Sequence, residues 1–302
     1  MKKKIYIAGS GGMLGKAFHE IFGADYELRC SDKDVNESWL NFCDFRNFDH
    51  YREEVITYKP DYLFHLGAHT DLEYCQKNEQ DAIDTNVKSV ENACKIALEL
   101  DIPILYISTA GIFDGKQDTY DDDDHVVPIS IYGQTKYDGE LAVKNKIKKY
   151  FICRAGWMMG GGPSKDKKFI NKVMKQLKAG KNELFIVNDK AGTPTYTIDF
   201  AKNVKLLVEK NEYGLYNMVC SGVTDRVEVT HELLRLLKLE NKVKITEVNS
   251  DYFKVEYAAP RPESERLINA RLNEKGLNQM RNWKICLSEY LDKDFKGFLE
   301  SK

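Results

Sequence analysis

The chain has 302 residues and a formal net charge of −2 at pH 7, with 45 basic and 47 acidic side chains. This length suits one large α/β domain or two lobes with separate cores, and the charge gives no reason to expect a nucleic-acid partner or an acidic membrane surface. The seven cysteines are scattered without a Cys-x-x-Cys pair, and neither a signal-peptide core nor a membrane-spanning run of about 18 apolar residues is present, so we expect a cytoplasmic protein with reduced thiols and no membrane partner.

An apolar segment at the start of the chain runs directly into a glycine-rich turn. Residues 5–8 predict a buried strand, and the glycines that follow have a G-x-x-G-x-x-G spacing before a helical pattern begins. Such a turn lets the backbone approach a pyrophosphate, which then lies at the positive end of the helix; a plain βα turn is the alternative. The predicted cofactor contacts in this turn are Gly9, Gly12, Met13, Leu14 and Gly15.

The second predicted strand, residues 26–31, ends at an acidic residue. Asp32 lies about twenty residues after the glycines, where a carboxylate holds the ribose diol of NAD and repels the 2′-phosphate of NADP. Arg29 and Lys33 are close enough in sequence to leave the choice between NADH and NADPH open.

Two further segments are predicted to line the cofactor. Asp44, with Phe45, either contacts the adenine edge or caps a helix over residues 46–58. A third strand, residues 61–66, then leads into Gly67, Ala68, His69 and Thr70, of which the first three are expected at the cofactor and Thr70 at the substrate. His65 and His69 have the spacing of zinc ligands on a helix, but they straddle a strand end and a glycine, so we expect no metal.

The middle of the chain brings hydroxyl groups to the end of a central strand. A long amphipathic helix is predicted over residues 79–100, with Asn86 either in a buried polar bond or in the site. Residues 102–107 predict a central parallel strand that ends at Ser108 and Thr109. Open α/β sheets place their chemistry at this edge.

Tyr132 and Lys136 lie one turn apart in a helix predicted to end near residue 149. A lysine charge beside a phenol favours the phenolate, so we expect the tyrosine pKa to fall from about 10 toward neutrality. Such a tyrosine exchanges a proton with a carbonyl or alcohol oxygen, although Tyr-x-x-x-Lys pairs also occur by chance on exposed helices. The acidic run at residues 121–124 lacks the pattern of a calcium site and predicts a solvated loop.

The alternation of strands and helices predicts two lobes. Residues 1–155 have the pattern of a doubly wound parallel sheet, a Rossmann-type dinucleotide-binding domain. Residues 156–184 and 221–302 predict a smaller interleaved α/β lobe that binds the substrate, while residues 185–220 partly return to the sheet domain.

Taken together, these segments resemble the extended short-chain dehydrogenase/reductases, and within them the dTDP-4-dehydrorhamnose reductase family. The likeness extends over nearly the full chain. Besides the glycine turn, it rests on Ser108-Thr109 followed by Ile112-Phe113-Asp114-Gly115, on Tyr132 with Lys136, on Arg154 to Trp157, on Gly192-Thr193-Pro194-Thr195, and on Arg261-Pro262 with Ser264.

The resemblance implies an enzyme that uses NADPH or NADH to reduce the 4-keto group of a nucleotide-linked 4-keto-6-deoxy sugar, for surface polysaccharide or other deoxysugar synthesis. It implies that Thr109 binds the substrate carbonyl, Tyr132 donates the proton and Lys136 holds the nicotinamide ribose. A nucleotide-diphosphate sugar is the expected partner, and a homodimer is left open. The implied substrate contacts are Thr70, Asn86, Thr109, Ala110, Trp157, Thr195 and Arg261.

Some of these assignments have structural alternatives. Arg261 suits a diphosphate because its donors are forked, and the alternative is a surface ion pair. Trp157 could pack at the interface between the lobes. Ala110 departs from the family, which has an aspartate after the threonine, and this leaves the exact sugar open.

Two other functions fit the same scaffold. Ala110-Gly111 lacks the Asp-Glu pair with which related dehydratases work, so dehydration is disfavoured. A sugar-nucleotide epimerase needs only Thr109, Tyr132, Lys136 and a retained NAD, and is one alternative. The other is a non-catalytic regulatory subunit that keeps the nucleotide fold and binds a partner enzyme.

Overall fold

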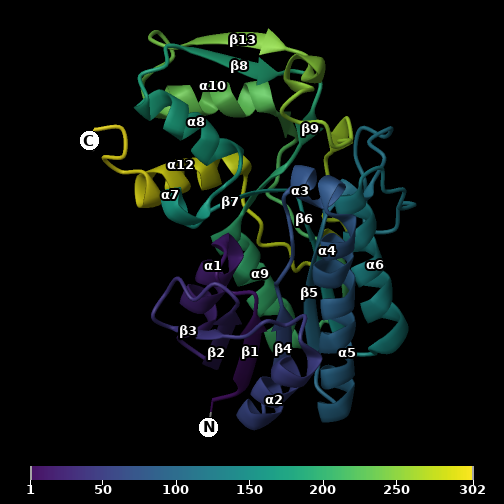
Figure 1. The fold of residues 1–302 in the computed structure, drawn as a ribbon. Coiled ribbons are helices and arrows are strands. Elements are labelled where there is room, and N and C mark those ends of the chain that lie inside the picture. The colour runs from purple at the N-terminus through teal and green to yellow at the C-terminus, as the bar shows by residue number, and fades with distance from the viewer. Residues whose placement is uncertain (1, 301–302) are drawn as a thin grey trace.

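The computed structural model describes residues 2–300 and has two lobes, the larger of which is built on a parallel sheet (Figure 1). The sheet has seven strands in the order β11-β6-β5-β4-β1-β2-β3, and every neighbouring pair is parallel. The strands are β1 (Lys4–Ala8), β2 (Glu27–Asp32), β3 (Leu40–Phe42), β4 (Tyr62–His65), β5 (Ile104–Thr109), β6 (Tyr150–Ala155) and β11 (Gly214–Asn217). The order reverses between β1 and β4, so the predicted doubly wound Rossmann class is confirmed.

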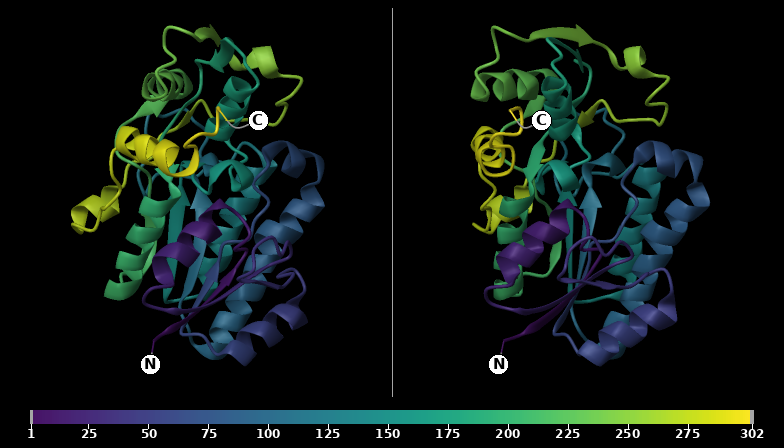
Figure 2. Two further views of the ribbon diagram at one scale, coloured as in Figure 1. Left: turned by 90° about the vertical axis from the view of Figure 1, so that its left-hand side faces the viewer. Right: turned by 60° about the vertical axis from the view of Figure 1, so that its left-hand side comes forward.

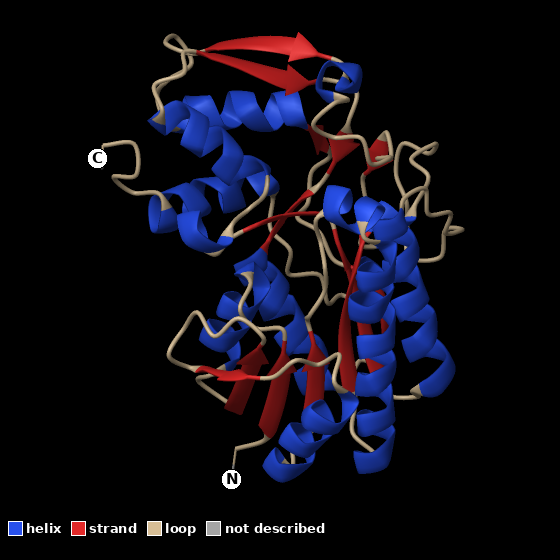
Figure 3. Ribbon diagram, in the orientation of Figure 1, coloured by secondary structure: helices blue, strands red, loops and turns tan. Residues whose placement is uncertain are grey.

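Alternating side chains of β1 show how the sheet separates two cores. Ile5 and Ile7 pack into one core with α1 and α9, and Tyr6 and Ala8 pack into the other with α2, α5 and α6. Figures 2 and 3 show these two layers of helices on opposite faces of the sheet. The helices are α1 (Met13–Phe22), α2 (Phe48–Tyr58), α5 (Ser89–Leu100), α6 (Ile131–Lys146) and α9 (Thr197–Lys210).

The smaller lobe lies above the sheet in Figure 1, where β8 (Glu183–Val187) and β13 (Lys244–Val248) form a parallel pair over α10 (Arg226–Leu236). The other helices of this lobe are α7 (Gly162–Lys165), α8 (Phe169–Lys178) and α12 (Trp283–Asp294). Where the smaller lobe meets the larger one, it contains two short sheets, made of β7 (Trp157–Met159) with β10 (Pro194–Tyr196), and of β12 (Thr224–Asp225), β9 (Ala191–Gly192) and β14 (Ser264–Glu265). Within residues 185–220, therefore, β11 is a strand of the large sheet and α9 packs against that sheet, whereas β8 belongs to the small lobe.

The predicted continuous helix over residues 79–100 is interrupted. α4 (Glu79–Ile83) is followed by a π-helical turn at Asp84–Lys88 and then by α5. π-turns within helices often occur at functional sites, and this one contains Asn86. The remaining short elements are α3 (Leu72–Lys77), α11 (Ala270–Glu274) and 3-10 turns at Ala110–Ile112 and Ser250–Phe253. Across residues 2–300, the structure contains no helix with the length and apolar character needed to cross a membrane.

A buried ion pair joins α6 to the sheet. The Arg154 guanidinium on β6 donates to both carboxylate oxygens of Glu140, at 2.8 and 2.9 Å, and the two residues are 1% and 0% exposed. Arg154 also donates to the backbone oxygen of Asp122 at 3.2 Å. Asp122 itself is buried and accepts from the backbone N–H groups of Asn217 and Arg271, so the expectation of a fully solvated acidic loop is wrong at this residue. Burial raises the pKa of its carboxyl group.

We expect Glu140→Leu to lower the free energy of unfolding by about 3–5 kcal/mol, because it leaves the Arg154 charge buried without its carboxylate. Urea denaturation measures this loss. The double variant Glu140→Leu/Arg154→Leu removes both charges and should recover most of the stability. A double variant as unstable as the single one would contradict this account of the pair.

Candidate active site

The glycine turn after β1 leaves the N-terminus of α1 open. Gly9 has a φ of +78°, and a Cβ there would lie 2.2 Å from the backbone nitrogen of Gly67. A Cβ on Gly15 would lie 2.1 Å from the backbone oxygen of Ser10, whereas Gly12, the N-cap residue before α1, has open space within 4 Å. The first and last glycines therefore allow close backbone packing, and the middle one leaves room at the helix end, as a pyrophosphate requires.

Asp32 lies beside this turn at the end of β2. Its carboxylate accepts from the backbone N–H groups of Gly11 at 2.8 Å and Asp34 at 3.0 Å. Lys165, from α7 of the small lobe, donates to the backbone oxygen of Gly11 at 3.1 Å. The turn, the acidic residue and the small lobe thus meet at one place.

Asp44 does not cap α2. The helix begins at Phe48, and the side chain of Asn47 accepts from the backbone N–H of His50. Asp44 instead pairs with Arg46 at 2.7 Å, so the helix-cap interpretation was wrong. The Phe45 ring lies against Gly67, where an added Cβ would approach it to 2.3 Å. Contact of these residues with the adenine stays a prediction.

Asn86 fixes the loop after β4. Its side chain is fully buried, accepts from the backbone N–H of His69 at 2.8 Å, and donates to the His69 backbone oxygen and the Thr135 hydroxyl. Lys168 of the small lobe donates to the backbone oxygen of Thr70 at 2.9 Å. The segment from Gly67 to Thr70 is thereby tied to α6 and to the small lobe. Of the two sequence interpretations of Asn86, these contacts match the buried polar bond.

Two of the predicted catalytic residues, Thr109 and Tyr132, approach each other where β5 ends and α6 begins, and Lys136 lies one turn further along α6. Ser130 caps α6 and accepts from the backbone N–H of Gly133, which places Tyr132 in the first turn. A Cβ added to Gly111 would lie 3.6 Å from both the Thr109 hydroxyl oxygen and the Tyr132 ring. The Lys136 ammonium lies 4.3 Å from the centroid of the Tyr106 ring.

The electrostatics of this group differ from the sequence expectation. Burial raises the pKa of Tyr132 to about 12, an effect that hydrogen bonding by Thr109 partly offsets. Burial also lowers the pKa of Lys136 to about 7, against the opposite influence of Glu140. The expected fall of the tyrosine pKa was wrong, because desolvation outweighs any effect of the lysine. A phenol with this pKa keeps its proton at neutral pH, as a proton donor must.

The predicted substrate contacts occupy different surroundings. Ala110 is 1% exposed in a small apolar cluster, and the buried Thr195 hydroxyl accepts from the backbone N–H of Gly156. The Arg261 guanidinium donates to the carboxylate of Glu73 at 2.7 Å and to the backbone oxygen of Ala259 at 2.8 Å. Its donors are therefore partly used within the protein, which agrees with the ion-pair alternative. Substrate contact by these three residues stays a prediction.

Trp157 organises the part of the site that the small lobe contributes. Its indole N–H donates to the Glu265 carboxylate at 2.7 Å. The Arg226 guanidinium lies 4.3 Å from the centroid of the Trp157 ring and 4.7 Å from that of the Phe169 ring. Within the part of the chain described, Arg226 makes no ion pair, and burial lowers its pKa to about 10.

Arg226, Glu265 and Lys168 were missed by the sequence analysis. Each comes from a segment far along the chain from Tyr132. No sequence motif includes Arg226 or Lys168, and Glu265 could have been noticed only because it directly follows the Arg261–Ser264 signature.

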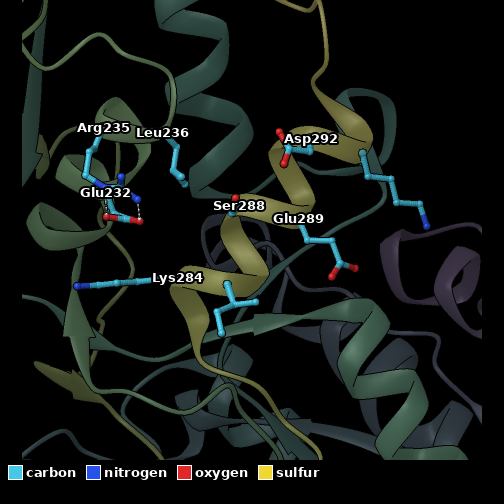
Figure 4. A pocket seen from close by; sticks show the side chains of 9 residues that line it. Glu232, Arg235, Leu236, Lys284, Ser288, Glu289 and Asp292 are labelled. Atoms are coloured by element: carbon cyan, nitrogen blue, oxygen red, sulfur yellow. Dashed lines mark hydrogen bonds and ion pairs between the residues drawn. The ribbon is translucent and has the colours of Figure 1, made fainter.

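Figure 4 shows a separate surface hollow between α10 and α12. It is lined by charged side chains such as Glu232, Arg235 and Lys284, and none of its lining residues belongs to the candidate site. Among the residues described, no cluster of histidine, cysteine and acidic side chains could hold a metal ion.

Comparison with known proteins shows what the chain is similar to. It is 29% identical over 290 residues to the spore coat polysaccharide biosynthesis protein SpsK of Bacillus subtilis, which covers 95% of this chain and 96% of that protein. A crystal structure of a dTDP-4-dehydrorhamnose reductase from Clostridium acetobutylicum is 30% identical, with a TM-score of 0.87 over 96% of this chain and 98% of that one. The Bacillus anthracis dTDP-4-dehydrorhamnose reductase in complex with NADP is 27% identical, with a TM-score of 0.88 over 97% of this chain and 100% of that one.

The family model described as the RmlD substrate binding domain matches residues 2–295. The chain therefore belongs to the RmlD substrate binding domain family.

Proposed function

We propose that this protein uses NADPH or NADH to reduce the 4-keto group of a nucleotide-linked 4-keto-6-deoxy sugar. The observation that carries the proposal is the approach of Thr109 and Tyr132 at the carboxyl end of β5, with Lys136 one turn along the same helix as Tyr132. The relatives named dTDP-4-dehydrorhamnose reductase, one of them in complex with NADP, support the same reaction.

The glycine turn fits a dinucleotide. The open end of the ten-residue helix α1 at Gly12 and the close packing at Gly9 form the cradle that a pyrophosphate needs. Asp32, beside the turn, would hold the adenosine ribose, and Lys136 the nicotinamide ribose. When bound, the nicotinamide supplies the hydride.

The residues of this chain would supply the proton and orient the carbonyl. The substrate oxygen would lie between the hydroxyl groups of Thr109 and Tyr132. The Tyr132 phenol would give its proton to that oxygen during the reduction, and the Thr109 hydroxyl would hold the oxygen in place. The raised pKa keeps this proton in place until the oxygen becomes basic.

Arg226 is the stronger candidate for the substrate diphosphate. Unlike Arg261, which is paired with Glu73, it makes no ion pair in the described chain and is flanked by Trp157 and Phe169. A guanidinium held between rings keeps its forked donors available for phosphate oxygens.

The direct test of the proposed function follows nicotinamide absorbance. NADPH and NADH are each offered with 4-keto-6-deoxy sugars on dTDP, GDP, UDP and CDP, and we expect oxidation with at least one pair. No oxidation with any pair would overturn the reductase proposal. In that case, interconversion of sugar epimers would favour the epimerase, and copurification with a partner enzyme the regulatory subunit.

Tyr132→Phe should lower kcat by about 10²- to 10⁴-fold, because it removes the proton donor. The binding of NADPH, followed by fluorescence titration, should change little. Tyr137→Phe, five residues further along the same helix, is the matched control and should retain activity. Near-normal turnover by Tyr132→Phe would exclude it as the donor.

Arg226→Met should raise KM for the nucleotide sugar about tenfold to hundredfold, since hydrogen bonds to charged groups contribute about 1.5–3 kcal/mol. The KM for NADPH should stay the same. Arg235→Met on the same helix is the control, because Arg235 pairs with Glu232 on the surface. An unchanged KM for the sugar in Arg226→Met would assign the diphosphate to other residues.

A further inference from the structure

The small lobe brings a carboxylate to the catalytic group. Glu265 lies on β14, which pairs with β9 so that Glu265 is opposite Gly192. A Cβ on Gly192 would lie 2.2 Å from the Trp157 ring, so the glycine lets this ring pack directly on the strand. The Trp157 indole N–H then donates to one oxygen of Glu265 at 2.7 Å. Strand pairing and this hydrogen bond together fix where the carboxylate points.

The second oxygen of Glu265 borders the place where Thr109 and Tyr132 meet. A Cβ added to Gly111 would lie 3.5 Å from Oε1 of Glu265 and 3.6 Å from both the Thr109 hydroxyl oxygen and the Tyr132 ring. The three groups therefore surround a single point. The negative charge of Glu265 also acts on Tyr132 and contributes to its raised pKa, after burial, which is the larger cause.

Glu265 is not neutralised by a direct partner. No basic side chain within residues 2–300 forms an ion pair with it, although Arg226 and Lys168 are near enough to feel its charge. Its sole hydrogen-bond donor in this part of the chain is Trp157. The oxygen that faces Thr109 and Tyr132 is thus free to accept a hydrogen bond from a ligand.

The chemistry of the substrate identifies the group that this oxygen can bind. In a 4-keto-6-deoxy hexose the carbonyl carbon has two neighbours in the ring. C5 carries the methyl group and the ring oxygen, neither of which donates a hydrogen bond, whereas C3 carries a hydroxyl. An ionised carboxylate only accepts hydrogen bonds, so the 3-hydroxyl is the adjacent group that matches it.

We propose that Glu265 accepts a hydrogen bond from the 3-hydroxyl of the sugar and selects substrates that carry it. The inference rests on the proposed reduction at C4. Glu265 comes from the small lobe, whereas Thr109 and Tyr132 come from the large one. Because that residue is on the other lobe, the pocket is complete only when both lobes contact the sugar.

The test compares two substrates on the same nucleotide, a 4-keto-6-deoxy sugar and its 3-deoxy analogue. The wild-type enzyme should favour the 3-hydroxy sugar about tenfold to hundredfold in kcat/KM, the range expected of a hydrogen bond to a charged group. Glu265→Ala should bring the two values close together. Glu263→Gln is the control, because Glu263 is exposed two residues earlier, and it should keep the wild-type ratio.

Glu265→Gln provides a second readout that preserves an acceptor for Trp157. Removing the charge lowers the Tyr132 pKa, so activity that needs the protonated phenol should be lost at a lower pH than in the wild type. A purely structural role of Glu265 would leave this alkaline fall of the pH–rate profile unchanged.

The outcomes separate the two proposals. A wild-type enzyme that oxidises no cofactor with either sugar overturns the proposed function, and this inference with it. A wild-type enzyme that works on the sugars while Glu265→Ala keeps the full preference for the 3-hydroxyl overturns the inference alone.

Discussion

The parallel direction of the seven strands is the constraint on which the site depends. Because every strand ends at the same edge, the turn after β1, the loop after β4 and the hydroxyl of Thr109 at the end of β5 must lie near one another. Gly9 then lets the first two loops touch backbone to backbone. Asn86 holds the second loop against α6, which presents Tyr132 and Lys136.

The small lobe adds what the sheet cannot supply. Trp157 follows β6 and contacts two side chains of opposite charge. Its indole N–H donates to the Glu265 carboxylate, and the Arg226 guanidinium packs on its ring face. In the proposed function, Glu265 would bind the sugar and Arg226 the diphosphate, the two ends of a nucleotide sugar. Lys165 and Lys168, which reach the loops at Gly11 and Thr70, tie this lobe to the cofactor side. The sheet would therefore perform the reaction, and the small lobe would determine which sugar undergoes it.

Sequence patterns correctly predicted those parts of the structure that depend on short-range residue spacing. The Gly9–Gly15 turn, the strand ending at Thr109 and the helix that carries Tyr132 and Lys136 follow from short-range spacing, and the structure contains all of them. The N-cap of α2 shows the limit of such rules. Asp44 and Asn47 are both suitable N-cap residues within one turn of each other, and the structure uses Asn47. Glu265 and Arg226 were beyond reach, because strand pairing and ring packing between distant segments place them. The pKa values of Tyr132 and Lys136 likewise depend on burial, which spacing does not reveal.

The transfer of deuterium from a labelled cofactor tests the central claim most directly. NADPH or NADH carrying deuterium at the transferable position of the nicotinamide is mixed with the enzyme and a 4-keto-6-deoxy nucleotide sugar, and the product is analysed by mass spectrometry and NMR. The account predicts one deuterium, bound to C4 of the sugar. A sugar product without deuterium, or with deuterium at another carbon, would contradict it.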